Sequence, residues 1–105
     1  MEQPNLNYIK ELAAGDEGFE RKLIEVVQKE LPVEIEEYLA NLNNAAYLLA
    51  AENVHKLKHK LGILGLEKGY AIAIEYETQL REGNADLKNT FQSILNACTN
   101  FISGL

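Results

Sequence analysis

The sequence predicts an all-α protein: an antiparallel four-helix bundle with a short additional N-terminal helix. Apolar residues recur every three or four positions over four long segments, which is the spacing of an amphipathic helix. No segment shows the strict alternation of apolar and polar residues that is typical of a strand. The connections are short, so the four segments must pack antiparallel to bury their apolar faces. Residues 1–105 are enough for one domain with one modest core.

The first two elements are a short helix over about 6–14 and a long helix over about 16–42. Gly15 ends the short helix, and Asp16 is a typical N-cap for the long one. Pro32 lies inside the long helix, lacks a backbone donor and clashes one turn back, so we expect a kink there. The residues of the long helix expected in the core are Phe19, Leu23, Val27, Leu31, Ile35, Leu39 and Leu42.

Three further helices follow a connection at 41–44, over about 46–64, 67–82 and 86–103. Gly65 is a typical C-terminal stop for the first of them. Cys98 falls in the apolar stripe of the last helix, so we expect a small buried hydrophobe there. The expected core residues are Ala50, Val54, Leu57, Leu61 and Leu64, then Tyr70, Ala73, Tyr76 and Leu80, then Leu87, Phe91, Ile94, Leu95, Cys98, Phe101 and Ile102.

Composition and charge exclude several classes of function. The net charge of −6 argues against nucleic acid as a partner. A single cysteine permits no internal disulfide and indicates a reducing compartment. The N-terminus lacks the features of a signal peptide, and no apolar run approaches the length of a membrane span. We therefore expect a cytoplasmic protein without a membrane partner. The absence of nucleotide-binding glycine motifs predicts no ATP site, so a phosphoryl group would have to come from another protein.

Both histidines lie in "HKLKHKLGILG" at 55–65. A helix turns by about 100° per residue, so His55, Lys58, His59 and Gly62 share one face. That face lies about a third of a turn from the apolar stripe of the same helix. We therefore expect His55 to stand on the surface of the bundle, with its imidazole close to water.

Three interpretations of this face compete. His55 and His59 have the H-x-x-x-H spacing of a metal site, and "ENVH" is half of a di-iron motif. No third histidine exists and lysines crowd the segment, so we expect no metal. A second interpretation is a docking patch for an acidic partner. Its cations would be Lys56, Lys58, Lys60 and Lys68. By contrast, Glu34, Glu36 and Glu37 on the long helix are expected to be a solvated acidic face.

The third interpretation is chemical. A neutral imidazole is a competent nucleophile near neutral pH, and attack on a phosphoryl group requires exposure and nearby cations. Lys58, one turn from His55 on the same face, is placed to supply a cation. Gly62 inside a helix costs about 1 kcal/mol relative to alanine. Such a glycine is typical of close approach, either by a neighbouring helix or by a partner.

These residues resemble a known family. "HKLKHKLGILGL" resembles the signature of histidine-containing phosphotransfer (HPt) domains, H-x-L-K-G with a further glycine ten positions after the histidine. His55, Leu57, Lys58 and Gly65 take those places in register. "GDEGFERKLIEVVQKELP" resembles the second helix of the family, and "EYETQLREGN" the end of a later one. Glu77 and Arg81 stand 22 and 26 positions after His55, where the family commonly has an acidic or amide residue and a basic one.

The resemblance implies a four-helix bundle that accepts a phosphoryl group on His55 from the aspartyl phosphate of a receiver domain and passes it to another receiver. Lys58 would stabilise the phosphoryl oxygens, Glu77 would orient the imidazole, and Arg81 would aid the phosphate or the partner surface. Receiver domains of response regulators or hybrid kinases would be the partners. Magnesium would belong to the receiver, so no cofactor is expected here. We expect a monomer. The partner contacts would include Lys56, His59, Gly62 and Gly65.

One departure concerns His59, which stands where the family usually has glycine. An imidazole there would either crowd the receiver or donate a hydrogen bond to the phosphoryl group. It is not expected to be the acceptor itself, because Gly62 stands where its lysine would be. The alternative functions are a non-catalytic module that docks receiver or kinase domains, and a metal-binding bundle.

Overall fold

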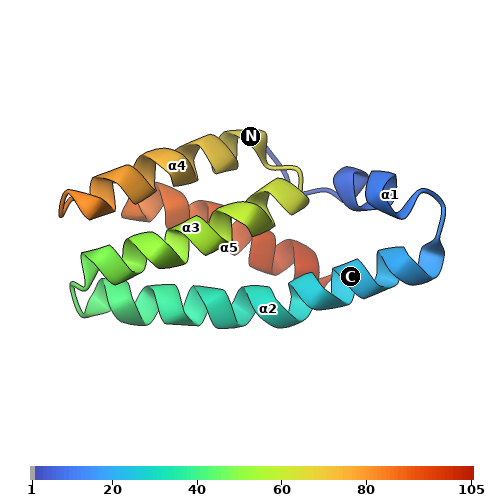
Figure 1. Cartoon of the computed structure of the whole chain (residues 1–105), viewed down its shortest axis with the longest axis horizontal. Helices are drawn as coiled ribbons and strands as arrows, with labels where there is room; N and C mark the ends of the chain where they lie inside the picture. Colours follow the sequence, from blue (N-terminus) through green and yellow to red (C-terminus); the bar gives the residue numbers. More distant parts are fainter. Residues whose placement is uncertain (1) are drawn as a thin grey trace.

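The all-α prediction is confirmed. A computed structural model describes residues 2–105, and within them it holds five helices and no strand. Helix α1 (Asn7–Ala13) is short, and α2 (Glu17–Asn43), α3 (Tyr47–Ile63), α4 (Glu67–Arg81) and α5 (Lys88–Ser103) are long. The long helices run up and down side by side, while α1 lies against the N-terminal part of α2 at one end (Figure 1). The molecule is elongated, with extents of 44 × 23 × 19 Å.

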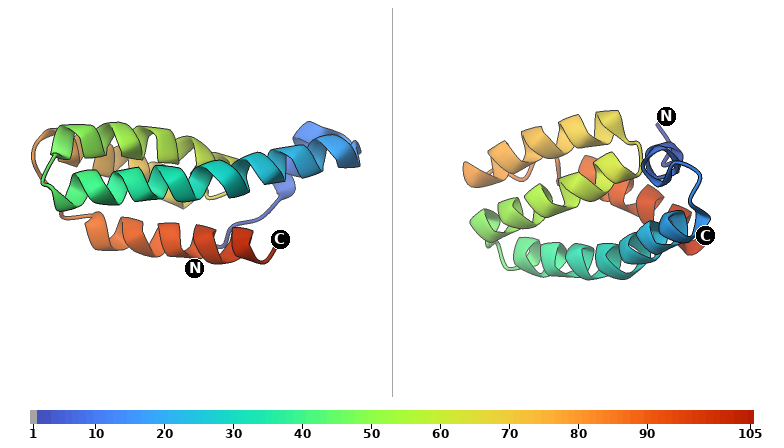
Figure 2. Two further views of the ribbon diagram at one scale, coloured as in Figure 1. Left: turned by 90° about the horizontal axis from the view of Figure 1, so that it is seen from below. Right: turned by 45° about the vertical axis from the view of Figure 1, so that its right-hand side comes forward.

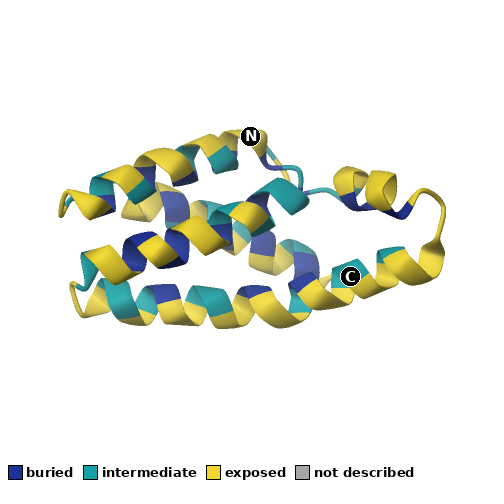
Figure 3. Ribbon diagram, viewed as in Figure 1, coloured by how far each residue is buried: buried dark blue, intermediate teal, exposed yellow. Residues whose placement is uncertain are grey.

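The core lies between α2, α3, α4 and α5, where the buried faces of the helices point inward (Figure 3). Its centre is a cluster of three rings, Tyr38, Tyr76 and Phe91, each completely buried. Cys98 is also completely buried, as predicted, and burial raises the pKa of its thiol to about 12. Other predicted core residues are half-buried and pack at its margin, namely Ile35, Leu39, Leu42, Leu87, Ile94 and Phe101. Leu23 and Tyr70, also predicted in the core, are half-buried.

The predicted core stripe of α2 is wrong at its start. Phe19 is 45% exposed, whereas Tyr38, which the stripe omitted, is buried. Residues four apart differ by about 40° in direction around a helix. A predicted stripe that takes every fourth residue therefore rotates gradually away from the face that is buried in the core. Tyr38 stands eleven residues after Val27, which returns it to within about 20° of that buried residue.

Two predicted boundaries shift. The connection expected at 41–44 is still helical through Asn43, and Asn41 donates a 2.6 Å hydrogen bond to Asn53 on α3. The chain turns instead at Ala45, whose φ is 55°. The fifth helix begins at Lys88 rather than 86. Helix α2 continues through Pro32 without interruption, and in place of the sharp kink expected there it curves along its length (Figure 2).

The N-terminal segment is hydrogen-bonded to the end of α3 and the first turn of α4. The carboxylate of Glu2 accepts hydrogen bonds from the backbone N–H groups of Lys68 and Gly69, at 2.9 and 3.0 Å. The backbone N–H of Asn5 donates to the carbonyl of Leu64 at 2.8 Å. The N-terminal segment thus contacts the end of α3 and the start of α4. Among residues 2–105, no helix has both the length and the apolar character needed to cross a membrane.

Candidate functional site

The fold brings four predicted site residues together on the outer surface of α3 and α4. His55 and Lys58 lie one turn apart on α3, and Glu77 and Arg81 lie one turn apart on α4. The side chain of His55 is 51% exposed, which confirms its expected place on the surface. Glu77 and Lys58 are much more enclosed, at 16% and 13%. An open imidazole thus stands above a partly buried carboxylate and ammonium.

A hydrogen bond to Glu77 fixes the imidazole of His55. Nδ1 of His55 lies 3.1 Å from Oε1 of Glu77. An ionised carboxylate only accepts hydrogen bonds, so we assign the proton to Nδ1. Nε2 then carries the free lone pair of the neutral ring. Within the described chain, Nε2 has no hydrogen-bond partner. The site therefore presents a nucleophilic nitrogen to solvent.

Lys58 interacts with the same carboxylate. Its Nζ lies 3.3 Å from Nδ1 of His55 and 3.7 Å from Oε1 of Glu77. Two donors do not hydrogen-bond each other, so with the proton on Nδ1 the ammonium is an ion-pair partner of Glu77. It also lies 5.7 Å from the centre of the Tyr70 ring, a cation–π contact. Tyr70 was predicted only as a core residue, although its place seven residues before Glu77 puts it on the same face of α4.

Glu77 remains ionised at the centre of this network. Burial alone would raise its pKa, but hydrogen bonds from His55 and Arg81 and the charges of His55 and Lys58 lower it below its ordinary value. Arg81 contributes through Nη2, 3.2 Å from Oε2 of Glu77. The two oxygens of Glu77 thus have separate tasks. One orients the imidazole, and the other holds the guanidinium close by.

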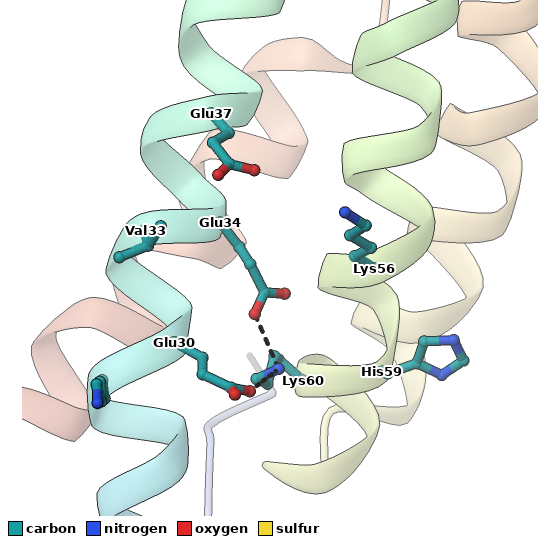
Figure 4. A pocket seen from close by; sticks show the side chains of 8 residues that line it. Glu30, Val33, Glu34, Glu37, Lys56, His59 and Lys60 are labelled. Atoms are coloured by element: carbon teal, nitrogen blue, oxygen red, sulfur yellow. Dashed lines mark ion pairs between the residues drawn. The ribbon is translucent and has the colours of Figure 1, made fainter.

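The predicted cationic patch is smaller than expected. Lys60 forms ion pairs with Glu30 and Glu34 of α2, at 3.0 and 2.9 Å (Figure 4). Burial lowers the pKa of Lys60, but the two carboxylates outweigh this and raise it. Glu34 therefore belongs to an ion pair between helices, which corrects its assignment to a solvated face. Lys56 remains exposed beside the groove between α2 and α3.

Both glycines predicted to contact a partner have close neighbours within the chain. A side chain at Gly62 would meet the ring of Tyr70 at 3.5 Å, which is ordinary contact with α4. Gly65 has a φ of +77°, and a Cβ there would come within 2.6 Å of the Asn5 side chain. The turn and the N-terminal segment account for glycine at 65.

His59 stands next to His55 on the surface. The two ring centres are 5.4 Å apart and the ring planes meet at 88°. No three histidine, cysteine, aspartate or glutamate side chains of residues 2–105 are grouped to hold a metal ion.

Comparisons of the chain with protein-family models, with curated proteins and with solved structures gave no match. The functional interpretation therefore depends on the geometry of the site and on the sequence.

Proposed function

We propose that this protein is a phosphoryl carrier of the histidine phosphotransfer type. His55 would accept a phosphoryl group on Nε2 from the aspartyl phosphate of a receiver domain and return it to another receiver. The observation that carries the proposal is the hydrogen bond between His55 and Glu77, which leaves Nε2 as the free nucleophile. The register of His55, Lys58, Glu77 and Arg81 with the HPt signature supports the same function.

The chemistry is a displacement at phosphorus. The lone pair of Nε2 forms the P–N bond, the P–O bond to the aspartate breaks, and its electrons leave on the carboxylate. The ring becomes more positive as the P–N bond forms, and Glu77 offsets this charge through the Nδ1 proton. Transfer onward reverses these steps. Magnesium bound to the receiver would neutralise the phosphoryl oxygens during transfer.

The charges around His55 suit an acidic partner. Lys58 and Arg81 together outnumber the single carboxylate between them. The active site of a receiver domain carries aspartates, so the two surfaces attract each other although the chain as a whole is acidic. Such a relay would operate in the cytoplasm.

The test is intact-mass analysis after incubation with a phosphorylated receiver domain. Wild type and His59→Gln should gain one phosphoryl group, and His55→Gln should gain none. The adduct should be lost in acid and survive base, as a phosphoramidate does. Wild type without an adduct from several receivers, or an adduct on His55→Gln, would rule out the proposal.

A second candidate is a docking module that carries no phosphate. Exposed apolar side chains favour it, because Leu48 shares the His55 face of α3 and Ile74 lies one turn before Glu77 on α4. A docking module would keep its affinity for a receiver in His55→Gln and would gain no mass in wild type. Calorimetric titration beside the mass measurement separates the two functions.

A further inference from the structure

We infer that His59 binds the phosphoryl group of phosphorylated His55 and slows its hydrolysis. In this role the imidazole of His59 donates a hydrogen bond to a phosphoryl oxygen on Nε2. The inference rests on the proposed function and assigns a separate task to a residue that the relay chemistry does not require.

The first support is the contact between the two rings. His59 stands four residues after His55 on α3, so the two side chains are neighbours on one face. Their ring centres are 5.4 Å apart, and the planes are nearly perpendicular at 88°. A group bonded to Nε2 extends outward from the ring of His55 by the length of a P–N and a P–O bond. With the ring centres only 5.4 Å apart, a group of this length can reach the imidazole of His59.

The second support is that Lys58 and Arg81, the two cations beside His55, already interact with Glu77. Lys58 is paired with Glu77 and lies at Nδ1, and Arg81 is held by the other oxygen of Glu77. In residues 2–105, His59 makes no hydrogen bond and no ion pair. An imidazole carries an N–H donor in either charge state, so His59 can bind an anionic oxygen without first taking up a proton.

The third support is the direction of the side chain. Lys56 extends over the groove toward α2, whereas His59 lies at the rim of the groove with its ring pointing away from Glu34 and Lys60 (Figure 4). The acidic side chains of the groove therefore do not occupy its donor. The imidazole of His59 therefore remains available to interact with a group on the face that carries His55.

The expected effect is on the lifetime of the phosphohistidine. Hydrolysis breaks the P–N bond through a loose transition state in which electron density moves from the phosphoryl oxygens toward phosphorus. A donor on one of those oxygens opposes this movement, and the ring also covers one side of phosphorus from water. Loss of a charge-assisted hydrogen bond should shorten the half-life by roughly three- to tenfold.

The experiment uses phosphoramidate as a small phosphoryl donor, so that receiver docking plays no part. The P–N bond of the reagent breaks, ammonia leaves, and the new P–N bond forms at His55. After the reagent is removed, intact mass follows the decay of the adduct on wild type and on three variants. His59→Ala removes the ring, His59→Phe keeps a ring without a donor, and His59→Gln keeps an N–H donor at similar reach. Glu52→Ala, one turn before His55 and exposed, is the matched control.

We expect wild type, His59→Gln and Glu52→Ala to decay at similar rates, and His59→Ala and His59→Phe to decay several-fold faster. Equal half-lives in all variants would overturn the inference and leave the proposed function intact. A phenylalanine variant as long-lived as wild type would assign the effect to shielding and overturn the hydrogen bond. Wild type without any adduct would overturn the proposed function, and the inference with it.

Discussion

The hydroxyl oxygens of Tyr38 and Tyr76 lie 2.6 Å apart in the middle of an otherwise apolar core. They join α2 to α4, and both rings pack edge-on or tilted against Phe91 of α5. Burying a hydroxyl without a hydrogen-bond partner is unfavourable, so each tyrosine hydroxyl offsets the cost of burying the other. Burial and this contact raise the pKa of Tyr38, and burial raises that of Tyr76, so both remain neutral.

The contributions of these two hydroxyls to stability should therefore be coupled. Tyr38→Phe and Tyr76→Phe should each lower the free energy of unfolding by about 1–3 kcal/mol, because the remaining hydroxyl loses its partner. The double variant should lose clearly less than the sum of the two. Urea unfolding of the three variants measures this. Strictly additive losses would show that the hydroxyl pair contributes no coupling.

Gly65 and Gly83 offer a matched pair of substitutions. Both have a left-handed backbone, with φ of +77° and +80°. Alanine at 83 meets no atom within 4 Å, so we expect only the backbone penalty of about 1–2 kcal/mol. Alanine at 65 would also meet the Asn5 side chain at 2.6 Å, so the loss should be larger.

The excess loss at 65 should shrink when Asn5 is shortened. Comparing Gly65→Ala in the wild-type and Asn5→Gly backgrounds by chemical unfolding isolates the contact. Equal losses at 65 and 83 would mean that the N-terminal segment moves aside without effect on stability.

Helical periodicity was sufficient to predict the fold class and the approximate place of every helix, because each long segment buries one face. It was insufficient where contacts between helices determine where a helix ends or which residues are buried. Asn41 and Asn43 are typical of a loop, yet α2 continues through them because Asn41 reaches Asn53 on the neighbouring helix. Phe19 was misplaced for a geometric reason, since a stripe counted in steps of four residues rotates around the helix.

The candidate site was predicted by helical phase, which acts along a single helix, and by resemblance, which also relates two helices. Helical phase predicted that His55 is exposed beside Lys58. The register with the HPt signature predicted that Glu77 and Arg81 belong to the same site from a second helix. Ion pairs between helices that lie outside this resemblance were missed. Lys60 was counted as a free cation because nothing in its own helix indicates that Glu30 and Glu34 face it from α2.

Glu2 is expected to stabilise the fold from outside the bundle. Its carboxylate accepts from two N–H groups in the first turn of α4, which are otherwise without an intrahelical partner. Glu2→Ala should lower the free energy of unfolding by about 0.5–2 kcal/mol, the usual effect of losing an N-cap. Glu11→Ala on α1, exposed and outside these contacts, is the control. Thermal melting compares them, and equal shifts would argue against a capping role.

Glu77→Gln should slow phosphorylation of His55 while leaving the fold in place. The amide oxygen still accepts from Nδ1, but the negative charge that offsets the growing charge on the ring is lost. We expect a rate of adduct formation lower by roughly tenfold, about 1.4 kcal/mol in the barrier. Glu75→Gln, exposed on the same helix, should react at the wild-type rate. An unchanged rate in Glu77→Gln would remove Glu77 from the proposed chemistry.

Glu77 should also make stability depend on pH at the acid end. Its pKa is lowered in the folded state, because hydrogen bonds and cations outweigh burial, from an ordinary value of 4.5. The unfolded chain therefore takes up this proton first as the pH falls. The stabilisation is complete above about pH 4.5 and is lost as the pH falls through the lowered pKa of the folded state. Urea unfolding at intervals from pH 6 downward should show a steeper loss for wild type than for Glu77→Gln, which has no such proton to bind. Parallel curves for the two proteins would show that the network of His55, Lys58 and Arg81 does not hold this carboxylate ionised.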